Sequence, residues 1–294
     1  MLIMITGLTG FIGQHLLSKI NLNRHQLIAV VRKHSSTLPN GVQQVLVSEI
    51  DIITEQIDCF INLAGENIAA KPWSKSRKLE LYGSRVTLTE QIARQLKYPP
   101  KKVISMSAIG FYGDTNNDQV DEFTPAEESF THQLCHQWEQ AVEALNADKQ
   151  IIFRLGVVLG KGGALVKMRP AYLMALGGKI GDGNQWFSWV HIEDVVQAIL
   201  IAINTDQLNG IYNLTAPTPI RQNVFAQHYA TSLKRPSWLT TPKALLNLLL
   251  GEMSVLLTQG AAVYPKRLLE ENFDFQFKTI DEALLDIEKH WSVS

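Results

Sequence analysis

Short apolar runs and amphipathic stretches alternate along the first half of the chain. The apolar runs are rich in valine, isoleucine and leucine, and segments with helical spacing of their apolar positions separate them. Continuous runs of this kind are typical of parallel strands that are covered on both faces. The pattern therefore predicts an α/β fold with a doubly wound parallel sheet. We expect strands at 2–6, 27–31, 42–47, 59–64, 103–108 and 151–159, and helices at 11–20, 74–97 and 130–146.

The pattern changes after Leu159. Two glycine-rich stretches, GKGGALVKM and LGGKIGDGNQW, indicate loops, and WVHIEDVVQAILIAI indicates a short strand that runs into a helix. From about Thr215 the chain becomes richer in proline and is typical of a smaller mixed lobe. We therefore expect one domain over 1–160 and a smaller C-terminal lobe over 161–294, with a segment near 186–215 that completes the sheet.

Composition and charge restrict the classes of function. The 294 residues are 46% hydrophobic and 19% charged, and their formal net charge is −1. This balance gives no reason to expect nucleic acid or an anionic membrane as a partner. The apolar region 244–257 is interrupted by polar residues and is too short to span a bilayer, so it predicts a buried or groove-lining helix pair. Cys59 and Cys135 cannot form a disulfide framework, and a reduced cytoplasmic setting fits best.

A glycine-rich turn, TGLTGFIG at 6–13, follows the first predicted strand and opens the first predicted helix. Gly7, Gly10 and Gly13 let the chain turn tightly and let backbone N–H groups approach a pyrophosphate at the positive end of the helix dipole. Such glycines also mark close packing of a strand on a helix. Their place in an N-terminal βαβ unit favours the Rossmann-type dinucleotide site, which makes 1–160 the cofactor domain and the later lobe the substrate-binding one.

The end of the second predicted strand indicates which dinucleotide binds. A site that reads a free ribose 2′-OH needs a carboxylate about 20 residues beyond the glycines. Here the strand ends in Val31, Arg32 and Lys33, and the first acidic residue is Glu49. The planar guanidinium of Arg32 suits a 2′-phosphate, which predicts NADP(H) rather than NAD(H). The alternative is that Arg32 is a solvated residue at a strand end.

Further motifs resemble the extended short-chain dehydrogenase/reductases, which include nucleotide-sugar epimerases. NLAG at 62–65 is similar to their N-x-A-G segment, SMSAIGFYGD at 105–114 to their serine strand, and RLGVVLG and WVHIEDVVQAI to segments further along. INLAGENIAAKPWS, ALGGKIGDGNQW, NLTAPTPIR and PKRLLEENFDF resemble, more narrowly, the atypical bacterial "epimerase family". The resemblance implies that Ser107 donates a hydrogen bond to the substrate oxygen and that Arg32 faces the 2′-phosphate. It implies that the pyrophosphate and the adjacent cofactor edge are surrounded by Gly7, Thr9, Gly10, Phe11, Ile12, Gly13, Ala64 and Gly65.

The helix after the serine departs from that family. Its members carry Tyr-x-x-x-Lys there, with the tyrosine as general acid/base, and the resemblance aligns Thr131 with the tyrosine and Cys135 with the lysine. A threonine hydroxyl is far too weak an acid for this role, and a thiol cannot supply a positive charge. Tyr112 and His191 are the candidate replacements. Their structural alternatives are a packed turn residue and a hydrogen-bonded histidine at a strand end.

The same helix, SFTHQLCHQWE at 129–139, raises the question of a metal site. His132 and His136 have the spacing of two zinc ligands, but Gln133 stands where a zinc protease has its glutamate. The two histidines lie opposite an apolar stripe, so we expect them to be solvated and expect no metal. The stripe consists of Phe130, Leu134, Trp138, Ala141, Val142 and Leu145.

Two hypotheses for the function remain. The first is a cytoplasmic NADP(H)-dependent oxidoreductase or epimerase-like enzyme, whose small carbonyl or sugar-like substrate lies between the sheet edge and the lobe containing Gly177, Gly178, Gln185 and Trp186. The second is an NADP(H)-binding redox-responsive or scaffold protein with little turnover, which the missing tyrosine and lysine favour. By analogy alone, a homodimer is expected through the helices at 74–97 and 130–146. Candidate phosphate contacts for a nucleotide sugar are Arg169, Arg221 and Arg235.

Overall fold

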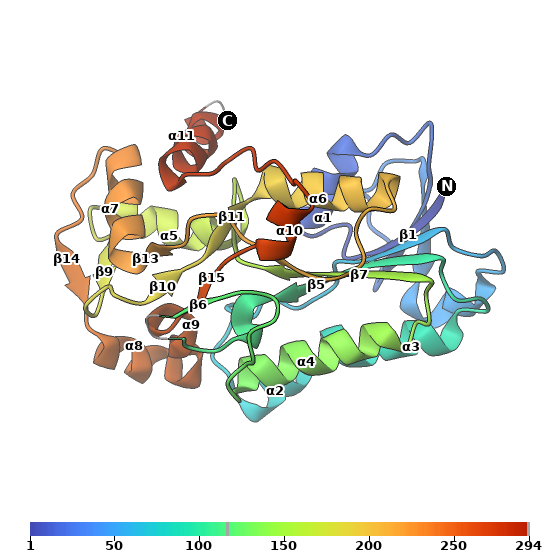
Figure 1. Cartoon of the computed structure of the whole chain (residues 1–294), viewed down its shortest axis with the longest axis horizontal. Coiled ribbons are helices and arrows are strands. Elements are labelled where there is room, and N and C mark those ends of the chain that lie inside the picture. Colours follow the sequence, from blue (N-terminus) through green and yellow to red (C-terminus); the bar gives the residue numbers. More distant parts are fainter. Residues whose placement is uncertain (116–117, 293–294) are drawn as a thin grey trace.

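The centre of the computed structural model, which describes residues 1–115 and 118–292, is a sheet of seven parallel strands (Figure 1). Their spatial order is β3-β2-β1-β4-β5-β7-β12. The order reverses between β1 and β4, and ligands of such sheets bind in the crevice beyond the carboxyl ends of those strands. The predicted doubly wound fold is confirmed. The strands are β1 (Leu2–Thr6), β2 (Gln26–Val31), β3 (Val42–Leu46), β4 (Cys59–Asn62), β5 (Lys102–Ala108), β7 (Lys149–Leu155) and β12 (Gly210–Leu214).

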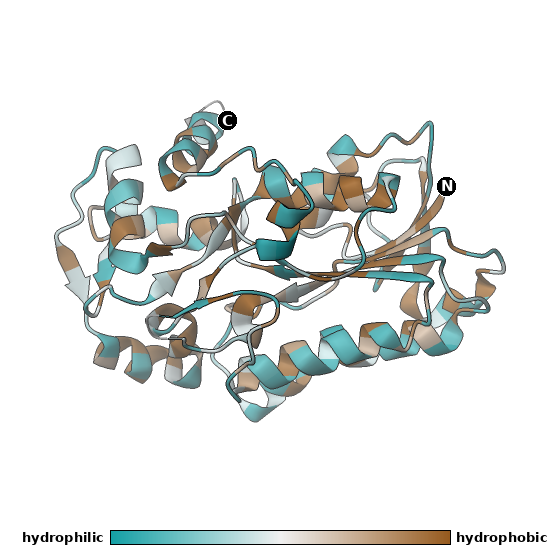
Figure 2. Ribbon diagram, in the orientation of Figure 1, coloured by the Kyte–Doolittle hydropathy of each residue, from teal (hydrophilic) through white to brown (hydrophobic). Residues whose placement is uncertain are grey.

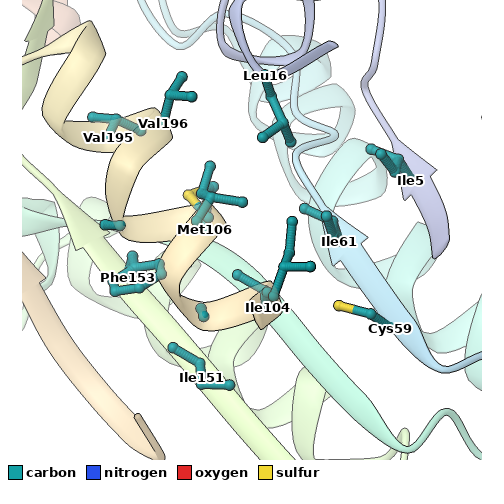
Figure 3. Packing of buried hydrophobic residues seen from close by; sticks show 14 of the residues in the cluster. Ile5, Leu16, Cys59, Ile61, Ile104, Met106, Ile151, Phe153, Val195 and Val196 are labelled. Carbon is teal, nitrogen blue, oxygen red and sulfur yellow. The ribbon is translucent and has the colours of Figure 1, made fainter. Parts of the chain in front are cut away.

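Helices cover both faces of this sheet. α1 (Phe11–Lys19) and α6 (Ile192–Asn204) pack on one face, and α2 (Lys75–Tyr82), α3 (Leu88–Gln95) and α4 (Phe130–Glu143) lie on the other. Alternate strand residues point to opposite faces, both of which are covered, which is why the strands are mainly apolar and largely brown in Figure 2. Figure 3 shows Ile5, Ile61 and Ile104 of the sheet with Leu16 of α1 and Val195 of α6 in one buried cluster.

The second lobe consists of shorter elements. Its helices are α5 (Gly163–Leu173), α7 (Gln222–Ser232), α8 (Lys243–Leu250), α9 (Val255–Thr258), α10 (Lys266–Glu270) and α11 (Ile280–Ser292). Four strand pairs accompany them: β8 (Val157–Leu159) with β11 (Trp189–His191), β9 (Gly178–Ile180) with β14 (Leu239–Thr241), β10 (Trp186–Phe187) with β13 (Ile220–Arg221), and β6 (Gln119–Val120) with β15 (Ala262–Val263). Short turns are η1 (Val47–Ile52), η2 (Gly83–Thr87), η3 (Ile109–Phe111) and η4 (Gly251–Ser254).

Four segments differ from the sequence prediction. The strand predicted at 151–159 is divided into β7 and β8, which belong to different sheets. GKGGALVKM, predicted as a loop, contributes the start of α5, because its glycines serve close packing: a Cβ on Gly162 would lie 2.4 Å from Cδ2 of Phe11. The helix predicted at 74–97 is divided by the π-helical turn η2. The helix pair predicted at 244–257 is buried only in part. α8 has no buried residue and Leu248 is 82% exposed, whereas Met253 of η4 is buried.

The C-terminal part of the chain packs into the core of the sheet. Leu268, Phe273 and Phe275 belong to the same buried cluster as Ile3 and Ile5 of β1. The two lobes therefore share the core that surrounds the sheet, and the second lobe has a further buried cluster that includes Trp189, Phe225 and Tyr229. The outer elements of the two lobes lie at opposite ends of the molecule (Figure 1). Within the described residues, every helix is too short or too polar to cross a membrane.

Candidate cofactor and substrate site

The glycine turn between β1 and α1 forms a cradle that side chains would fill. Gly7 has a φ of 71°, and a Cβ there would lie 2.6 Å from the backbone of Leu63; a Cβ on Gly13 would lie 2.5 Å from the carbonyl oxygens of Gly7 and Leu8. Gly10 is the N-cap residue of α1, and no side chain caps the helix. The first N–H groups of α1 are therefore available to an anion, and Thr9 and Gly10 are exposed beside them. These features fit a pyrophosphate.

Buried polar groups hold the loop after β4 against this turn. Thr6 donates to Asn62 Oδ1 at 2.8 Å, and Asn62 Nδ2 donates to Thr89 Oγ1 of α3 at 2.9 Å. The N–H of Ala64 donates to Thr6 Oγ1 at 3.3 Å. The chain therefore places Ala64 and Gly65 next to the glycine turn, where the resemblance predicts the edge of the cofactor.

Arg32 lies at the open end of the crevice, directly after β2. Its side chain is 85% exposed and donates to Glu66 Oε1 at 2.8 Å. Glu66 also accepts from Arg77 at 3.4 Å. The hydrogen bond from Arg32 is the main cause that lowers the pKa of the Glu66 carboxyl below its usual value. Arg32 is thus an exposed cation that is paired with Glu66, and its role toward a 2′-phosphate stays a prediction.

Ser107 and Tyr112 belong to a buried network. Ser107 Oγ donates to Glu139 Oε1 at 2.6 Å, and Arg154 donates to both Glu139 oxygens at 2.9 and 2.8 Å. The Tyr112 hydroxyl donates to Asn213 Oδ1 at 2.8 Å and accepts from Arg154 Nη1 at 3.0 Å. Burial raises the pKa of Tyr112, and both hydroxyls are 3% exposed or less. The proton that Ser107 was expected to donate to a substrate is donated to Glu139 instead.

Thr131 and Cys135 occupy successive turns of α4 and differ in access. Thr131 lines the main cavity of the described structure, whereas Cys135 is buried beneath it. Burial raises the pKa of the Cys135 thiol to about 11, with the Glu139 charge acting in the same direction. Cys135 is therefore protonated near neutral pH. Of the five predicted catalytic residues, Thr131 is the one that lines this cavity.

His191 has the structural role that the sequence offered as the alternative, that of a hydrogen-bonded histidine at the end of a strand. As the N-cap of α6, its Nδ1 accepts from the N–H of Glu193 at 3.2 Å, and its ring packs on Phe277 at a centroid distance of 3.8 Å. Burial, with His15 and His290 nearby, lowers its pKa to about 3. These contacts lead toward α11, and His191 is absent from the lining of the cavity among the described residues, so a catalytic role for it stays a prediction.

The histidines of α4 differ from each other. His136 is exposed as predicted, but His132 Nδ1 bonds to the carbonyl of Phe111 at 2.8 Å and fastens α4 to η3. The predicted apolar stripe of this helix is buried apart from the partly exposed Phe130. No group of three or more His, Cys, Asp or Glu residues among those described could hold a metal ion.

The main cavity has a volume of about 500 Å³ and lies between η3, the start of α4 and the second lobe. Trp186 lies on it as predicted, whereas Gly178 pairs with Leu239 of β14 elsewhere. None of its described lining residues is a lysine or an arginine. Its lining includes four aromatic side chains and four carboxylates: Trp73, Phe130, Trp186, Phe187, Asp114, Glu127, Glu128 and Glu252.

Two cations contact side chains that line the cavity. Lys78 lies over the Phe130 ring at 4.6 Å and pairs with Glu252, and the guanidinium of Arg221 stacks on Trp186 at 3.5 Å. Arg169, a candidate phosphate contact, instead pairs with Glu288 of α11 at 2.9 Å. The cavity thus presents acidic and aromatic groups to a ligand.

The sequence did not lead us to expect an ion pair between Glu139 and Arg154. A signal was present, because Arg154 interrupts the apolar run IIFRLGVVL and a charge in a buried strand needs a partner. Glu139 lies one helical turn after Cys135, on the buried edge of α4. Nothing in the spacing, however, showed that this carboxylate would take up the proton of Ser107.

Comparisons with known proteins agree with this architecture. A model of the NAD dependent epimerase/dehydratase family matches residues 3–215, and a domain of unknown function, DUF1731, matches residues 241–287. The "Epimerase family protein SDR39U1 homolog, chloroplastic" of Arabidopsis thaliana is 34% identical, over 97% of this chain and 86% of its own. YfhF, an epimerase family protein of Bacillus subtilis, is 34% identical, over 96% of each chain.

Solved structures give the same result. The crystal structure of human epimerase family protein SDR39U1 (isoform 2) with NADPH has a TM-score of 0.89 and 29% identity, over 98% of this chain and 99% of that one. MoeE5 in complex with UDP-glucose and NAD has a TM-score of 0.75 over 99% of both chains, but at 18% identity it shows the fold alone. The family resemblance that the motifs predict is confirmed.

Proposed function

Because this chain belongs to the NAD dependent epimerase/dehydratase family, we propose that it is an NADP(H)-dependent oxidoreductase or epimerase-like enzyme acting on a small carbonyl compound. The glycine cradle with the uncapped start of α1 carries the dinucleotide part of this proposal. Arg32 at the end of β2 supports NADP(H), since a guanidinium pairs well with a phosphate. The NADPH in the similar human structure agrees with that choice.

The lining of the cavity supports an uncharged or cationic substrate. Glu127 and Glu128 would repel the diphosphate of a nucleotide sugar. Glu252 contributes less to this repulsion, because it is paired with Lys78. Aromatic walls favour an apolar or aromatic body, or a cation over a ring. We therefore propose a carbonyl compound without phosphate as the substrate.

The chemistry of the site restricts the carbonyl further. Bound NADPH supplies a hydride to the carbonyl carbon, and the oxygen must gain a proton. Thr131 is the predicted catalytic residue that faces the cavity, and its hydroxyl is a very weak acid. General acid help is typically worth about 10² to 10⁴ in rate. The substrate is therefore an electron-poor carbonyl, which accepts hydride with less help from an acid.

A second candidate function is an NADP(H)-binding protein with little or no turnover. The observation that favours it is the burial of Ser107 and Tyr112, whose hydroxyls are bound to Glu139, Arg154 and Asn213. A protein of this kind responds to the redox state of the NADP(H) pool through cofactor occupancy alone. It shares the cofactor site with the first candidate and differs in turnover.

Fluorescence titration with NADPH and NADH tests the cofactor. We expect NADPH to bind more tightly, and Arg32→Gln to weaken NADPH binding about tenfold while NADH binding stays unchanged, because charge-assisted hydrogen bonds are worth about 1.5 to 3 kcal/mol. Lys33→Gln, at the exposed neighbouring position, is the matched control and should keep the preference. Equal affinities for both cofactors, or a preference that survives in Arg32→Gln, would refute the assignment.

Turnover separates the two candidate functions. NADPH oxidation should be screened against uncharged and cationic electron-poor carbonyls, with UDP-glucose as the phosphate-bearing comparison. A saturable rate with the former that Trp186→Ala lowers through KM supports the enzyme and places the substrate in the cavity. Silence across the panel with tight NADPH binding supports the binder, and turnover of UDP-glucose would exclude the proposed substrate class.

Two further proposals concern the setting of the protein. We propose a reducing cytoplasm, because Cys59 and Cys135 are both free and buried and no role for a disulfide is evident at either. We also propose a homodimer through α2, α3 and α4, the helices expected to pair by analogy alone. Sedimentation of the purified protein at several concentrations measures this association directly.

A further inference from the structure

His132 and His136 lie one turn apart on α4 and do not belong to the lining of the main cavity. Residues four apart on a helix are neighbours on its surface. Their imidazole rings lie nearly parallel, at an interplanar angle of 22°, with centroids 5.6 Å apart. The glutamate that Gln133 replaces is the general base of a zinc protease and not a ligand, so its absence does not weaken metal binding by the pair.

His132 is held in the orientation that metal-binding histidines adopt. Its Nδ1 lies 2.8 Å from the carbonyl oxygen of Phe111, which only accepts, so in the neutral ring Nδ1 carries the proton and Nε2 the lone pair. The Phe111 ring packs edge-on against the same imidazole at a centroid distance of 4.6 Å. Histidines that bind metals usually donate their other ring N–H to a carboxylate or a backbone carbonyl, which fixes the tautomer and the ring.

The nitrogens that would bind an ion are accessible. Nε2 of His132 has no hydrogen-bond partner among the described residues, and it is not one of their buried unpaired atoms. His136 is exposed, and within the same residues no hydrogen bond fixes its ring. Rotation of the His136 ring can therefore bring its nitrogen to an ion bound at Nε2 of His132, at the usual metal–nitrogen distance of about 2.0 to 2.1 Å.

We propose that His132 and His136 form a two-imidazole site for a borderline divalent ion such as Zn²⁺, Ni²⁺ or Cu²⁺. Imidazole nitrogen suits these ions, whereas Mg²⁺ and Ca²⁺ prefer oxygen ligands. The described residues offer no group of three His, Cys, Asp or Glu ligands, so water completes the coordination and the ion is exchangeable. The site departs from the sequence prediction of no metal, and it does not rest on the proposed cofactor or substrate.

Isothermal calorimetry of the chain without an added histidine tag tests the site, with Zn²⁺, Ni²⁺, Cu²⁺ and Mg²⁺ as separate probes. The wild type should bind one transition-metal ion per chain, Cu²⁺ most tightly, and should not bind Mg²⁺. His136→Asn should weaken Cu²⁺ binding about a hundredfold, because two linked ligands gain at least about that factor over one. This variant is decisive because His132 also fastens α4 to η3.

Two control variants separate this site from adventitious binding by surface histidines. His34→Asn, at an exposed position after β2, should bind Cu²⁺ like the wild type. His136→Asn combined with Gln133→His keeps two histidines on α4 but places them on adjacent residues, which do not face each other. This double variant should bind Cu²⁺ as weakly as His136→Asn alone.

Unchanged Cu²⁺ binding in His136→Asn, or recovery of binding on adding Gln133→His, would overturn the proposal and identify an adventitious ion only. A wild-type dissociation constant for Cu²⁺ above about 1 mM would overturn it as well. If the proposed homodimer forms through α4, two copies share one ion. The stoichiometry then falls to one ion per two chains, and the loss in His136→Asn remains the supporting result.

Discussion

At the scale of single residues, the environment of His191 decides its chemistry. Its Nδ1 caps α6, and its Nε2 lies 3.4 Å from Asp286 Oδ2 without a hydrogen bond. Asp286 would favour the protonated ring, whereas burial and the nearby His15 and His290 disfavour it. Burial should dominate because His191 is 1% exposed, so the ring is neutral in the folded protein.

This neutrality predicts a loss of stability in acid. The folded pKa of His191 is about 3 against 6.5 unfolded, so on acidification from pH 6.5 toward 3 the unfolded chain binds a proton that the folded one does not. Between pH 7 and 5 this costs about 2 kcal/mol of unfolding free energy, and the attraction of Asp286 reduces it. Urea unfolding at several pH values measures the effect.

His191→Asn is the variant for this test, because asparagine can still cap the helix but does not titrate. It should lose less stability between pH 7 and 5 than the wild type, even if it is less stable at pH 7. His136→Asn, at an exposed position of α4, should follow the wild-type pH profile. Parallel profiles for His191→Asn and the wild type would show that the histidine titrates equally in both states.

Residue identity at the site was only partly readable from the sequence. The glycine turn was readable, because its positions are set by backbone geometry that glycine alone satisfies without strain. The hydrogen bonds of Ser107 and Tyr112 were not readable. A resemblance gives the position of a residue in the chain, but it does not show which group the hydroxyl of that residue contacts.

At the scale of elements, α4 is fastened to the sheet by one buried ion pair. Glu139 of α4 and Arg154 of β7 are 6% and 3% exposed, and Arg154 also stacks on Phe111 at 3.4 Å. Burial acts to lower the pKa of Arg154, but the hydrogen bonds and charge of Glu139 outweigh it and raise the pKa overall. The pair thus joins α4, β7 and the η3 turn near the cavity.

Breaking this pair should destabilise the protein strongly. Glu139→Met or Arg154→Met alone leaves a buried charge without its partner, and each should cost about 3 to 5 kcal/mol. The double variant should cost clearly less than the two single losses together, because no unpaired charge remains. Chemical unfolding of the four proteins gives the coupling energy, and additive losses would show that the charges interact little.

A surface pair serves as the control for this cycle. Glu90 and Arg94 lie 3.9 Å apart on α3, and both are well exposed. Glu90→Gln should change the unfolding free energy by at most about 0.5 kcal/mol. A larger loss of unfolding free energy for the buried pair than for the surface pair would identify burial as the cause, since both pairs join an arginine to a glutamate.

The strands were predictable to within a few residues because each is a continuous apolar run buried on two faces, and β1 matches its prediction at both ends. The elements of the second lobe were harder to predict. α5 begins in a glycine-rich stretch whose glycines fit against Phe11, a tertiary contact that overrides local propensity. α8 has the leucines of a buried helix but exposes Leu245, Leu248 and Leu249, so its composition misled the prediction.

At the scale of the whole molecule, the shared core couples the two lobes. Leu268 and Phe275 lie in the same cluster as the strands that carry the glycine turn, and β12 completes the sheet after the chain has already built much of the second lobe. Removing the C-terminal part would expose this cluster and so weaken the core of the sheet. We therefore expect the lobes to unfold together.

Coincident unfolding transitions are the expected result in urea. Far-UV circular dichroism follows the sheet and helices, while tryptophan fluorescence includes Trp186 and Trp189 of the second lobe. NADPH at about a hundred times its dissociation constant should stabilise the folded state by about 2.7 kcal/mol and move both transitions equally. If NADPH shifted the circular dichroism transition and left the fluorescence transition in place, the lobes would unfold independently, and the common core would not couple them.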